Sequence, residues 1–417
     1  MADGASIGSD VQLELLDFLF RSFSADIGLM SGLDLEGSRI SKDLPLPIAD
    51  LNSSPLFLDY AVINASGKKI GVVRSSARGT EFPLIDSIMI GRTLFEQAEA
   101  ERQVLAQAAK DYPGAKLSTA GFVCYGYPRI GIVVLVADGS QQRRAIYDAH
   151  MTSYRVRELA GTKIGEAGAR GGDLPEGEPF YSFIDRLPEA GPSPVIGQQW
   201  NSAMRYVATV RAFQSGRSAA PAAVELLSTK QAERLIRESM AASLAAPAPP
   251  RPAISGTVLP ILRLIGQETP VFCAVATAAM ILEYIGYTGF TQQDIAKVFK
   301  TGEYGTYNAD MISGFETLTN GGWRAAVDTA PTVDKARDYL GSMIPGKTGI
   351  LGHARLLRGW REYSYVEPRS GHIMFRDSYY LVNDPYPIGS GQLVMESLMK
   401  PIGDFYRNLL SLSPTAP

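Results

Sequence analysis

The sequence predicts an α+β fold, in which helices and antiparallel strands occupy separate stretches of the chain. After residue 257 the helical patterns come first, and strand-like runs follow from Gly349 onward, an order that is typical of this class. Before residue 245 one helical segment lies between strand-like runs that short turns connect. The most apolar run, residues 130–137, is much shorter than the roughly 20 residues of a membrane-spanning helix, so we expect a buried strand there.

Composition and charge restrict the kinds of partner that we expect. The 417 residues are 20% charged and 45% hydrophobic, which is enough for two or three globular cores. Lys and Arg number 40 against 43 Asp and Glu, and a net charge of -3 provides no basic field for nucleic acid or an anionic membrane. Two cysteines, and an acidic start without a Sec signal pattern, lead us to expect a cytoplasmic protein or one exported by a Sec-independent route.

A change of composition at residues 245–256 divides the sequence. There alanine and proline replace the periodic apolar pattern, which favours an extended and exposed linker. A glycine-rich and charged stretch, residues 165–179, predicts an exposed loop. We therefore expect four parts: an N-terminal helix with its lead-in at 1–35, an α+β accessory or prodomain-like region at 36–215, a helix and Pro/Ala-rich linker at 216–256, and a C-terminal domain at 257–417.

The N-terminal region combines strands with one long helix. Residues 56–63 and 69–75 have the pattern of two strands joined by a turn at residues 64–67. Residues 93–111 have the Ala, Glu, Gln and Leu content of a helix, and further strand-like runs follow it. One helix against a curved sheet, in this order, resembles the cystatin-like or PepSY-like arrangement of some protease propeptides. Two more helical patterns precede the linker, at residues 200–214 and 222–245.

The C-terminal domain opens with a helix that is apolar almost all round. Thr269 and Pro270 supply the N-cap and first-turn signals, and Gly286 marks the end of the run FCAVATAAMILEY. Such a helix is expected at the centre of its domain. A second helix is predicted from Thr291, with Asp294 at the capping-box position. The remaining elements are helical patterns at residues 308–319 and 332–343, and then the strand-like runs HARLLRGW, GHIMFRDS, YYLVNDP and GQLVME.

One cysteine lies where a thiol becomes reactive. Cys273 falls in the first turn of the central helix, where the partial positive charge of the helix N-terminus favours the thiolate. A thiolate that attacks a carbonyl also needs a general acid, and the chain has three histidines: His150, His353 and His372. His150 follows a strand end, which favours a surface or structural role. Cys124 lies in an apolar strand, and we expect it to be a core residue.

Two strands of the C-terminal domain supply partners for such a thiol. His353 opens the strand HARLLRGW, and the strand YYLVNDP carries Asn383 and Asp384 near its end. Neighbouring antiparallel strands would place one of these two side chains against the second imidazole nitrogen, where it fixes tautomer and orientation. His372 is the alternative base, because it also follows a glycine and lies nearer to Asp384 in the sequence. Gln267, in the loop before the helix, and the backbone N–H of the cysteine are candidate donors to an oxyanion.

These segments resemble those of a known family. The stretch QETPVFCAVATAAMILEYIG, residues 267–286, is similar to the cysteine segment of papain-like cysteine peptidases of the bacteriocin-processing type, which include the peptidase domains of bacterial exporters. TQQDIAKVF, GHARLLRGW and VNDPYP are similar to the family's next helix, its histidine strand and its Asx-Asp-Pro segment. The resemblance covers about residues 257–405 and implies a papain-like peptidase domain at 257–417.

The same resemblance implies a role for each candidate residue. Gln267 would contribute to the oxyanion hole, Cys273 would be the nucleophile, His353 the general base and acid, and Asp384 the residue that orients the imidazole. The long separation between His353 and Asp384 indicates one inserted hairpin, roughly residues 362–378, that contains His372.

The sequence thus predicts a cysteine peptidase for a peptide or protein substrate, with an N-terminal region that is accessory or autoinhibitory. The extended linker at 245–256 is the expected processing site. Two alternatives stay open: a deamidase or acyltransferase that uses the same site, and a catalytically inactive peptide-binding domain. Dispersed histidines and cysteines, without a phosphate-loop or EF-hand pattern, predict neither a metal site nor a cofactor.

Overall fold

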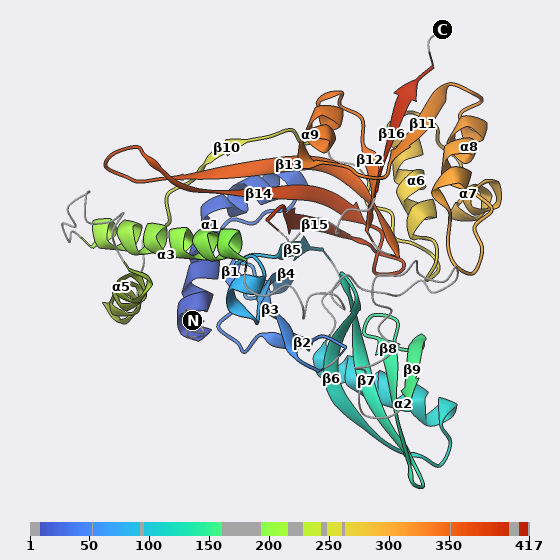
Figure 1. Cartoon of the computed structure of the whole chain (residues 1–417), viewed down its shortest axis with the longest axis horizontal. Helices are drawn as coiled ribbons and strands as arrows, with labels where there is room; N and C mark the ends of the chain where they lie inside the picture. Colours follow the sequence, from blue (N-terminus) through green and yellow to red (C-terminus); the bar gives the residue numbers. More distant parts are fainter. Residues whose placement is uncertain are drawn as a thin grey trace.

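The computed structural model shows a mixed α and β protein in which helices flank one extended sheet (Figure 1). The mixture of helices and strands agrees with the predicted class. No helix in the described part of the chain is both long and apolar enough to cross a lipid bilayer. The predicted loop at 165–179 lies outside the described residues, which are 9–51, 53–91, 96–160, 193–215, 228–242, 248–260, 263–350, 352–399 and 408–415.

The helices and strands have the following bounds. The helices are α1 (Ser9–Ser31), the 3-10 turn η1 (Gly79–Glu81), α2 (Gln97–Asp111), α3 (Pro194–Gln214), α5 (Thr229–Ala242), α6 (Cys273–Tyr284), α7 (Gln292–Val298), α8 (Asn308–Leu318) and α9 (Val333–Gly341). The strands are β1 (Arg39–Ile40), β2 (Leu46–Ala49), β3 (Pro55–Ile63), β4 (Lys69–Ser76), β5 (Ser87–Ile90), β6 (Lys116–Gly126), β7 (Arg129–Asp138), β8 (Gln141–Asp148), β9 (Arg155–Ala160), β10 (Ala253–Ser255), β11 (Trp323–Asp328), β12 (Gly346–Ile350), β13 (His353–Val366), β14 (Ile373–Asp384), β15 (Gln392–Ser397) and β16 (Asn408–Pro414). Their order in the sheet is β11-β16-β12-β13-β14-β15-β5-β4-β3-β2-β6-β7-β8-β9, with β1 beside β3 and β10 beside β13.

The sheet continues through the predicted domain boundary. β15 of the C-terminal part pairs with β5 of the N-terminal part, from Leu393 opposite Ile90 to Glu396 opposite Ser87. The described end of the proline-rich stretch also joins the sheet, because Ala253–Ser255 form β10 and pair with β13. A proline-rich stretch favours extended backbone, and extended backbone pairs with a strand edge wherever its N–H groups are present. The two parts of the chain are therefore joined by backbone hydrogen bonds as well as by the connecting segment.

Strands β13 and β14 form one long hairpin, and its outer half carries the N-terminal helices (Figure 1). Phe23 of α1 stacks on Tyr363 at a ring-centroid distance of 4.7 Å. Gln199 of α3 donates a hydrogen bond of 2.8 Å to Asp377. The predicted hairpin at residues 362–378 is the outer part of this longer hairpin. It buries a core against α1, α3 and α5, which explains why both strands extend so far from the rest of the C-terminal part.

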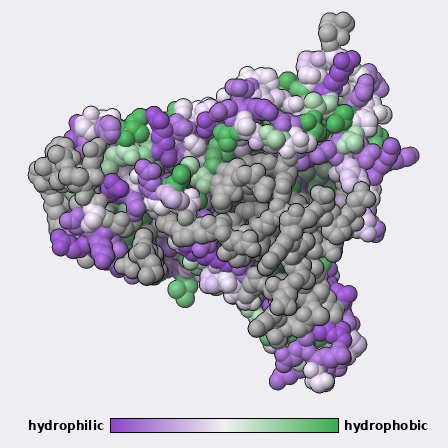
Figure 2. Space-filling view, viewed as in Figure 1, coloured by the Kyte–Doolittle hydropathy of each residue, from purple (hydrophilic) through white to green (hydrophobic). Residues whose placement is uncertain are grey.

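Strands β6–β9 and helix α2 form a lobe that projects from the rest of the molecule (Figure 1). Val104 and Ala108 of α2 are buried in one core with Cys124 and Ile132, so Cys124 is a core residue as predicted. The helix predicted at residues 93–111 is observed from Gln97 onward, and its first residues lie outside the described ones. Figure 2 shows mainly hydrophilic residues at the outer end of this lobe.

The central helix α6 begins at Cys273, and the predicted cap at Thr269 is wrong. A turn follows Thr269, closed by a 3.2 Å hydrogen bond from the N–H of Phe272 to its carbonyl. Phe272 is the N-cap residue and makes no side-chain capping bond. Because this turn comes before the helix, Cys273 is its first helical residue. Helix α7 has the predicted capping box between Thr291 and Asp294.

Candidate active site

Cys273 lies at the first position of α6 and faces the beginning of β13. The hydroxyl of Thr277, one turn further along the helix, donates a 3.3 Å hydrogen bond to the carbonyl of Ala354 and so fixes the helix on the strand. The sulfur is within hydrogen-bonding reach of the His353 side chain and of the Ala354 backbone N–H. Cys273 as a whole residue is partly exposed, but its sulfur is surrounded by protein.

The surroundings of Cys273 make its thiol more acidic than usual. Burial of the sulfur raises its pKa, but the hydrogen bond and charge of His353, the charge of Arg129 and the N–H of Ala354 outweigh burial and lower the pKa from 9.0 to about 7. The positive end of the α6 dipole acts in the same direction. A large share of this thiol is therefore ionised near neutral pH.

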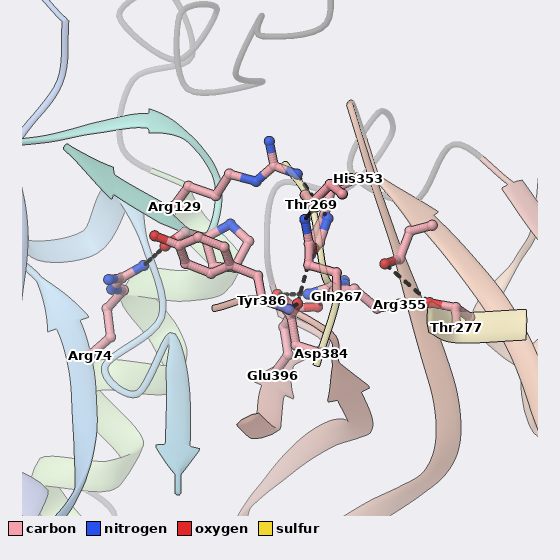
Figure 3. Close-up of polar contacts among 12 residues, drawn as sticks. Arg74, Arg129, Gln267, Thr269, Thr277, His353, Arg355, Asp384, Tyr386 and Glu396 are labelled. Atoms are coloured by element: carbon pink, nitrogen blue, oxygen red, sulfur yellow. Dashed lines mark hydrogen bonds and ion pairs between the residues drawn. The ribbon is translucent and has the colours of Figure 1, made fainter. Parts of the chain in front are cut away.

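Asp384 contacts the other side of the imidazole. The Nε2 of His353, the first residue of β13, lies 2.7 Å from Oδ1 of Asp384, the last residue of β14. Burial lowers the pKa of His353, but the charge of Asp384 and its hydrogen bond raise it above 6.5. The same oxygen accepts the backbone N–H of Tyr386 at 2.9 Å, which fixes the carboxylate (Figure 3). The structure thus brings together Cys273, His353 and Asp384, three residues that the sequence had singled out.

The alternative residues from the sequence lie elsewhere. Asn383 is directed to the opposite face of β14, where its amide nitrogen lies 3.9 Å from the sulfur of Met280. His372 is exposed at the turn of the β13–β14 hairpin. The 12 residues of β14 separate it from Asp384, which corresponds to roughly 40 Å along an extended strand. Neither side chain contacts the imidazole of His353 in this arrangement.

Gln267 lies in the loop before α6, and this loop is attached to the segment after β14. Its backbone N–H donates to the carbonyl of Pro385 at 2.9 Å, and its carbonyl accepts the N–H of Gly389 at 2.8 Å. The side-chain Nε2 donates to the carbonyl of Thr269 at 2.7 Å, so one amide hydrogen remains for another acceptor. Figure 3 draws Gln267 together with Thr269 among the residues of the site. Its Oε1 is buried and accepts no hydrogen bond from the described residues.

The cluster formed by Cys273, His353 and Asp384 has three neighbours to which the sequence analysis gave no role in the site. Arg129, the first residue of β7, comes from the projecting lobe, and its guanidinium lies 3.2 Å from Nδ1 of His353 (Figure 3). The ring of Tyr386 lies 5.8 Å from this guanidinium, and its hydroxyl donates to Asp148 at 2.8 Å. His150, expected only as a surface or structural residue, contacts the same hydroxyl at 2.9 Å. No local pattern indicates the Arg129 contact, because 224 positions separate it from His353.

Lys347 on β12 is a second cation in the electrostatic environment of Cys273. Its ammonium group donates to the side chains of Asn308 at 2.8 Å and Asn408 at 2.5 Å. Burial lowers the pKa of Lys347 to about 8, although the negative charge of Cys273 opposes this shift. Nothing in the sequence marks this lysine, because lysines in amphipathic strands are usually exposed.

A cavity of about 460 Å³ lies beside Tyr386, between the projecting lobe and strands β3–β5. Its volume is within the range of pockets that hold small ligands or peptide side chains. Tyr386 and His150 form the wall nearest to the cluster. Acidic residues outnumber basic ones in the lining, which includes Asp43, Asp59, Glu96, Glu101, Lys69 and Arg74. Across the described residues, no three His, Cys, Asp or Glu side chains are grouped so that they could hold a metal ion.

The sequence matches no family profile and no curated protein. Parts of the structure are similar to several solved structures, including the following three. The peptidase domain of Streptococcus ComA, a bifunctional ABC transporter of a quorum-sensing pathway, is 15% identical over 37% of this chain and 100% of its own length, with a TM-score of 0.28. A double-glycine-motif protease from an AMS/PCAT transporter, solved with the leader peptide, is 16% identical over 39% of this chain and 99% of its own length, with a TM-score of 0.27. UfSP from C. elegans is 15% identical over 40% of this chain and 35% of its own length, with a TM-score of 0.28.

Proposed function

We propose that the protein is a papain-like cysteine peptidase that hydrolyses peptide bonds in a peptide or protein substrate. The main support is the alignment of Cys273, His353 and Asp384: a thiol at a helix N-terminus, an imidazole beside it, and a carboxylate 2.7 Å from the far ring nitrogen. Burial alone would raise the pKa of the thiol, as it does for a cysteine in a core. The lowered pKa therefore reflects polar neighbours that favour a nucleophile.

The reaction would proceed through acyl transfer to the sulfur. The thiolate of Cys273 attacks the scissile carbonyl carbon, and the carbonyl oxygen takes up negative charge beside the Gln267 amide and the Cys273 N–H. The thiol proton, held on Nδ1 of His353, passes to the leaving amine as the C–N bond breaks. Water then gives a proton to His353 and attacks the thioester, which releases the carboxylic acid product and restores the thiol. Asp384 stabilises the imidazolium in both half-reactions.

We also propose that the N-terminal region is a permanent, accessory part of the fold. β5 supplies backbone hydrogen bonds to β15, and α1 and α3 cover the outer half of the β13–β14 hairpin. Arg358 donates to the carbonyl of Met30 at 2.7 Å, and the hydroxyl of Tyr363 donates to Asp26 at 2.8 Å. Loss of residues 1–256 would expose a strand edge and an apolar core, and both promote aggregation. These contacts favour an accessory role over that of a prodomain that dissociates after cleavage.

The two cysteines provide a matched test of the proposed nucleophile. The full-length protein is incubated with an epoxide probe and, separately, with a mixed peptide library whose products are identified by mass spectrometry. Cys273→Ala is expected to abolish labelling and cleavage, whereas Cys124→Ala, which alters a buried core residue, should retain both. Cleavage that persists in Cys273→Ala would show that the proposal is wrong.

The products also separate peptide hydrolysis from the related chemistries of a Cys-His-Asp site. New amino termini are expected for a peptidase. Ammonia release without chain cleavage would instead identify a deamidase, and transfer of the acyl group to an amine of an added acceptor peptide, in preference to water, would identify an acyltransferase. Labelling of Cys273 without any turnover would point to a peptide-binding domain that has kept an acidic thiol.

A further inference from the structure

We propose that Arg129 is a positioning residue of this site: its guanidinium, supplied by the N-terminal lobe, is a permanent cation that favours the Cys273 thiolate in addition to His353 and stays beside it when His353 is neutral. The inference deepens the proposed function, because it concerns the same thiol. It also gives the lobe a specific part in the site, since β7 begins with this residue.

The first step is the protonation state that the contact implies. Arg129 is buried, and one of its terminal nitrogens lies 3.2 Å from Nδ1 of His353. A guanidinium has only donors and keeps its charge throughout the working pH range. When Nδ1 accepts from this guanidinium, the ring is neutral and its proton is on Nε2, which donates to Asp384 at 2.7 Å. The contact with Arg129 therefore belongs to the neutral ring, whereas Asp384, which raises the pKa of His353 above 6.5, favours the protonated ring.

The second step concerns the charge of the thiolate. In a simple thiolate–imidazolium pair, the positive charge next to the sulfur is lost when the imidazole releases its proton. The guanidinium of Arg129 lies close enough to Cys273 that its charge favours the ionised sulfur and the sulfur charge favours the guanidinium. A neutral His353 can then remain the base while the thiolate keeps a cationic neighbour.

The third step is the way in which the fold aims Arg129 at the site. Its guanidinium lies 5.8 Å from the ring centroid of Tyr386, a distance at which a cation is attracted to the ring face. Tyr386 and Tyr125 both donate to Asp148, at 2.8 Å and 2.6 Å. Asp148 and Tyr125 belong to the lobe, whereas Tyr386 follows the strand that ends with Asp384. These hydrogen bonds fix the position of the lobe relative to the segment after β14, so that Arg129 reaches His353.

The test measures the thiol and not peptide turnover. The rate of Cys273 alkylation by iodoacetamide is recorded from pH 4 to 10 in the Cys124→Ala background, for the unchanged chain and for Arg129→Met, Arg129→Gln and Arg129→Lys. Loss of the charge in the Met and Gln variants should raise the midpoint of the profile by about one unit, which is about tenfold less thiolate at pH 6. Arg129→Lys keeps a cation at this position, so its midpoint should stay close to that of the unchanged chain. Arg143→Met, which removes an arginine from β8 of the same lobe, is the control and should leave the midpoint unchanged.

Three results would overturn the inference. An unchanged midpoint in both Arg129→Met and Arg129→Gln would show that the guanidinium does not stabilise the thiolate. If Arg129→Gln keeps the midpoint of the unchanged chain and Arg129→Met does not, then a hydrogen bond and not the charge stabilises the thiolate. Faster alkylation and faster peptide cleavage in Arg129→Met would show that the Arg129 side chain inhibits the site by blocking Nδ1 of His353. Because the midpoint is defined without a substrate, it stays interpretable if the protein cleaves no peptide, and failure of the proposed function is thus distinguishable.

Discussion

Replacement of His353 by alanine should move the titration of Cys273 by about two pH units. The imidazole provides the largest favourable influence on the thiolate, and the pKa of the thiol is lowered from 9.0 to about 7 against the effect of burial. Two units correspond to about 2.7 kcal/mol of preference for the thiolate. Without His353, the charge of Arg129 and the Ala354 N–H remain to oppose burial, so we expect a midpoint near pH 9.

The rate at a single pH is less informative than the whole profile. At pH 7 the thiolate fraction would fall from about one half to about 1%, a factor of about 50. A more basic thiolate is also the better nucleophile, by about 6–10-fold for two units of pKa. Alkylation of His353→Ala should therefore be only about 5–8-fold slower at pH 7 and faster than that of the unchanged chain at pH 10, so that the two curves cross. Peptide cleavage has no such compensation, and its rate should fall by about 10²–10⁴ because the general acid is lost.

The assay is iodoacetamide alkylation followed by mass spectrometry in the Cys124→Ala background, so that Cys273 is the sole thiol. His372→Ala is the matched control, because His372 is exposed at the hairpin turn, at the other end of β14 from Asp384. Its profile should coincide with that of the unchanged chain. If His353→Ala gives a profile with the same midpoint, or if His372→Ala shifts it, the assignment of His353 as the partner of the thiol is refuted.

Three further outcomes are expected. Burial raises the pKa of Asp377 from 3.8 to about 7, so the folded state keeps a proton that the unfolded chain releases. The contribution of Asp377 to the free energy of unfolding is therefore complete below pH 4 and is lost as the pH rises through 7. Asp377→Asn should remove this decline, of which about 3 kcal/mol falls between pH 5 and pH 8, in urea unfolding at these two pH values, and parallel curves for the two chains would contradict it. Gln267→Ala should lower kcat for peptide cleavage by about 10²–10³ without moving the alkylation midpoint, and a shifted midpoint would argue against a role confined to the oxyanion. A protease site placed at residues 248–252 and then cut should leave both fragments in one peak on gel filtration, because β5 and β15 remain paired; separation without denaturant would rule out a permanent N-terminal part.

Local patterns were sufficient for the parts of the site that lie on single elements. The capping box of Thr291 and Asp294 is observed, and the helix with Cys273 and the strand with His353 are found near the predicted positions. Each of these depends on signals within a few residues. The cap at Thr269 was wrong because a second turn, also compatible with Thr-Pro, precedes the helix.

Contacts between distant segments were not predictable in the same way. The pairing of β15 with β5 depends on which strand edge is available, and a single strand pattern carries no information about its neighbour. Arg129 has no sequence signal, because its partner lies 224 positions away. The proline-rich stretch was expected to be a linker, whereas its described end pairs with β13, since composition predicts extended backbone without specifying its partner.

The arrangement of cations around Cys273 has consequences for the order of events in turnover. Acylation requires a proton on Nδ1 of His353 for the leaving amine, whereas deacylation requires the neutral ring as a base toward water. With Arg129 as the proposed permanent cation, the thiolate keeps a cationic neighbour when the ring is neutral, and Lys347 adds its charge below its pKa of about 8. A rise in pH through 7 would therefore favour deacylation while the nucleophile remains ionised. Below pH 7 the ring is more often protonated, but the thiol also takes up its proton, so the acylation rate cannot gain from further acidification.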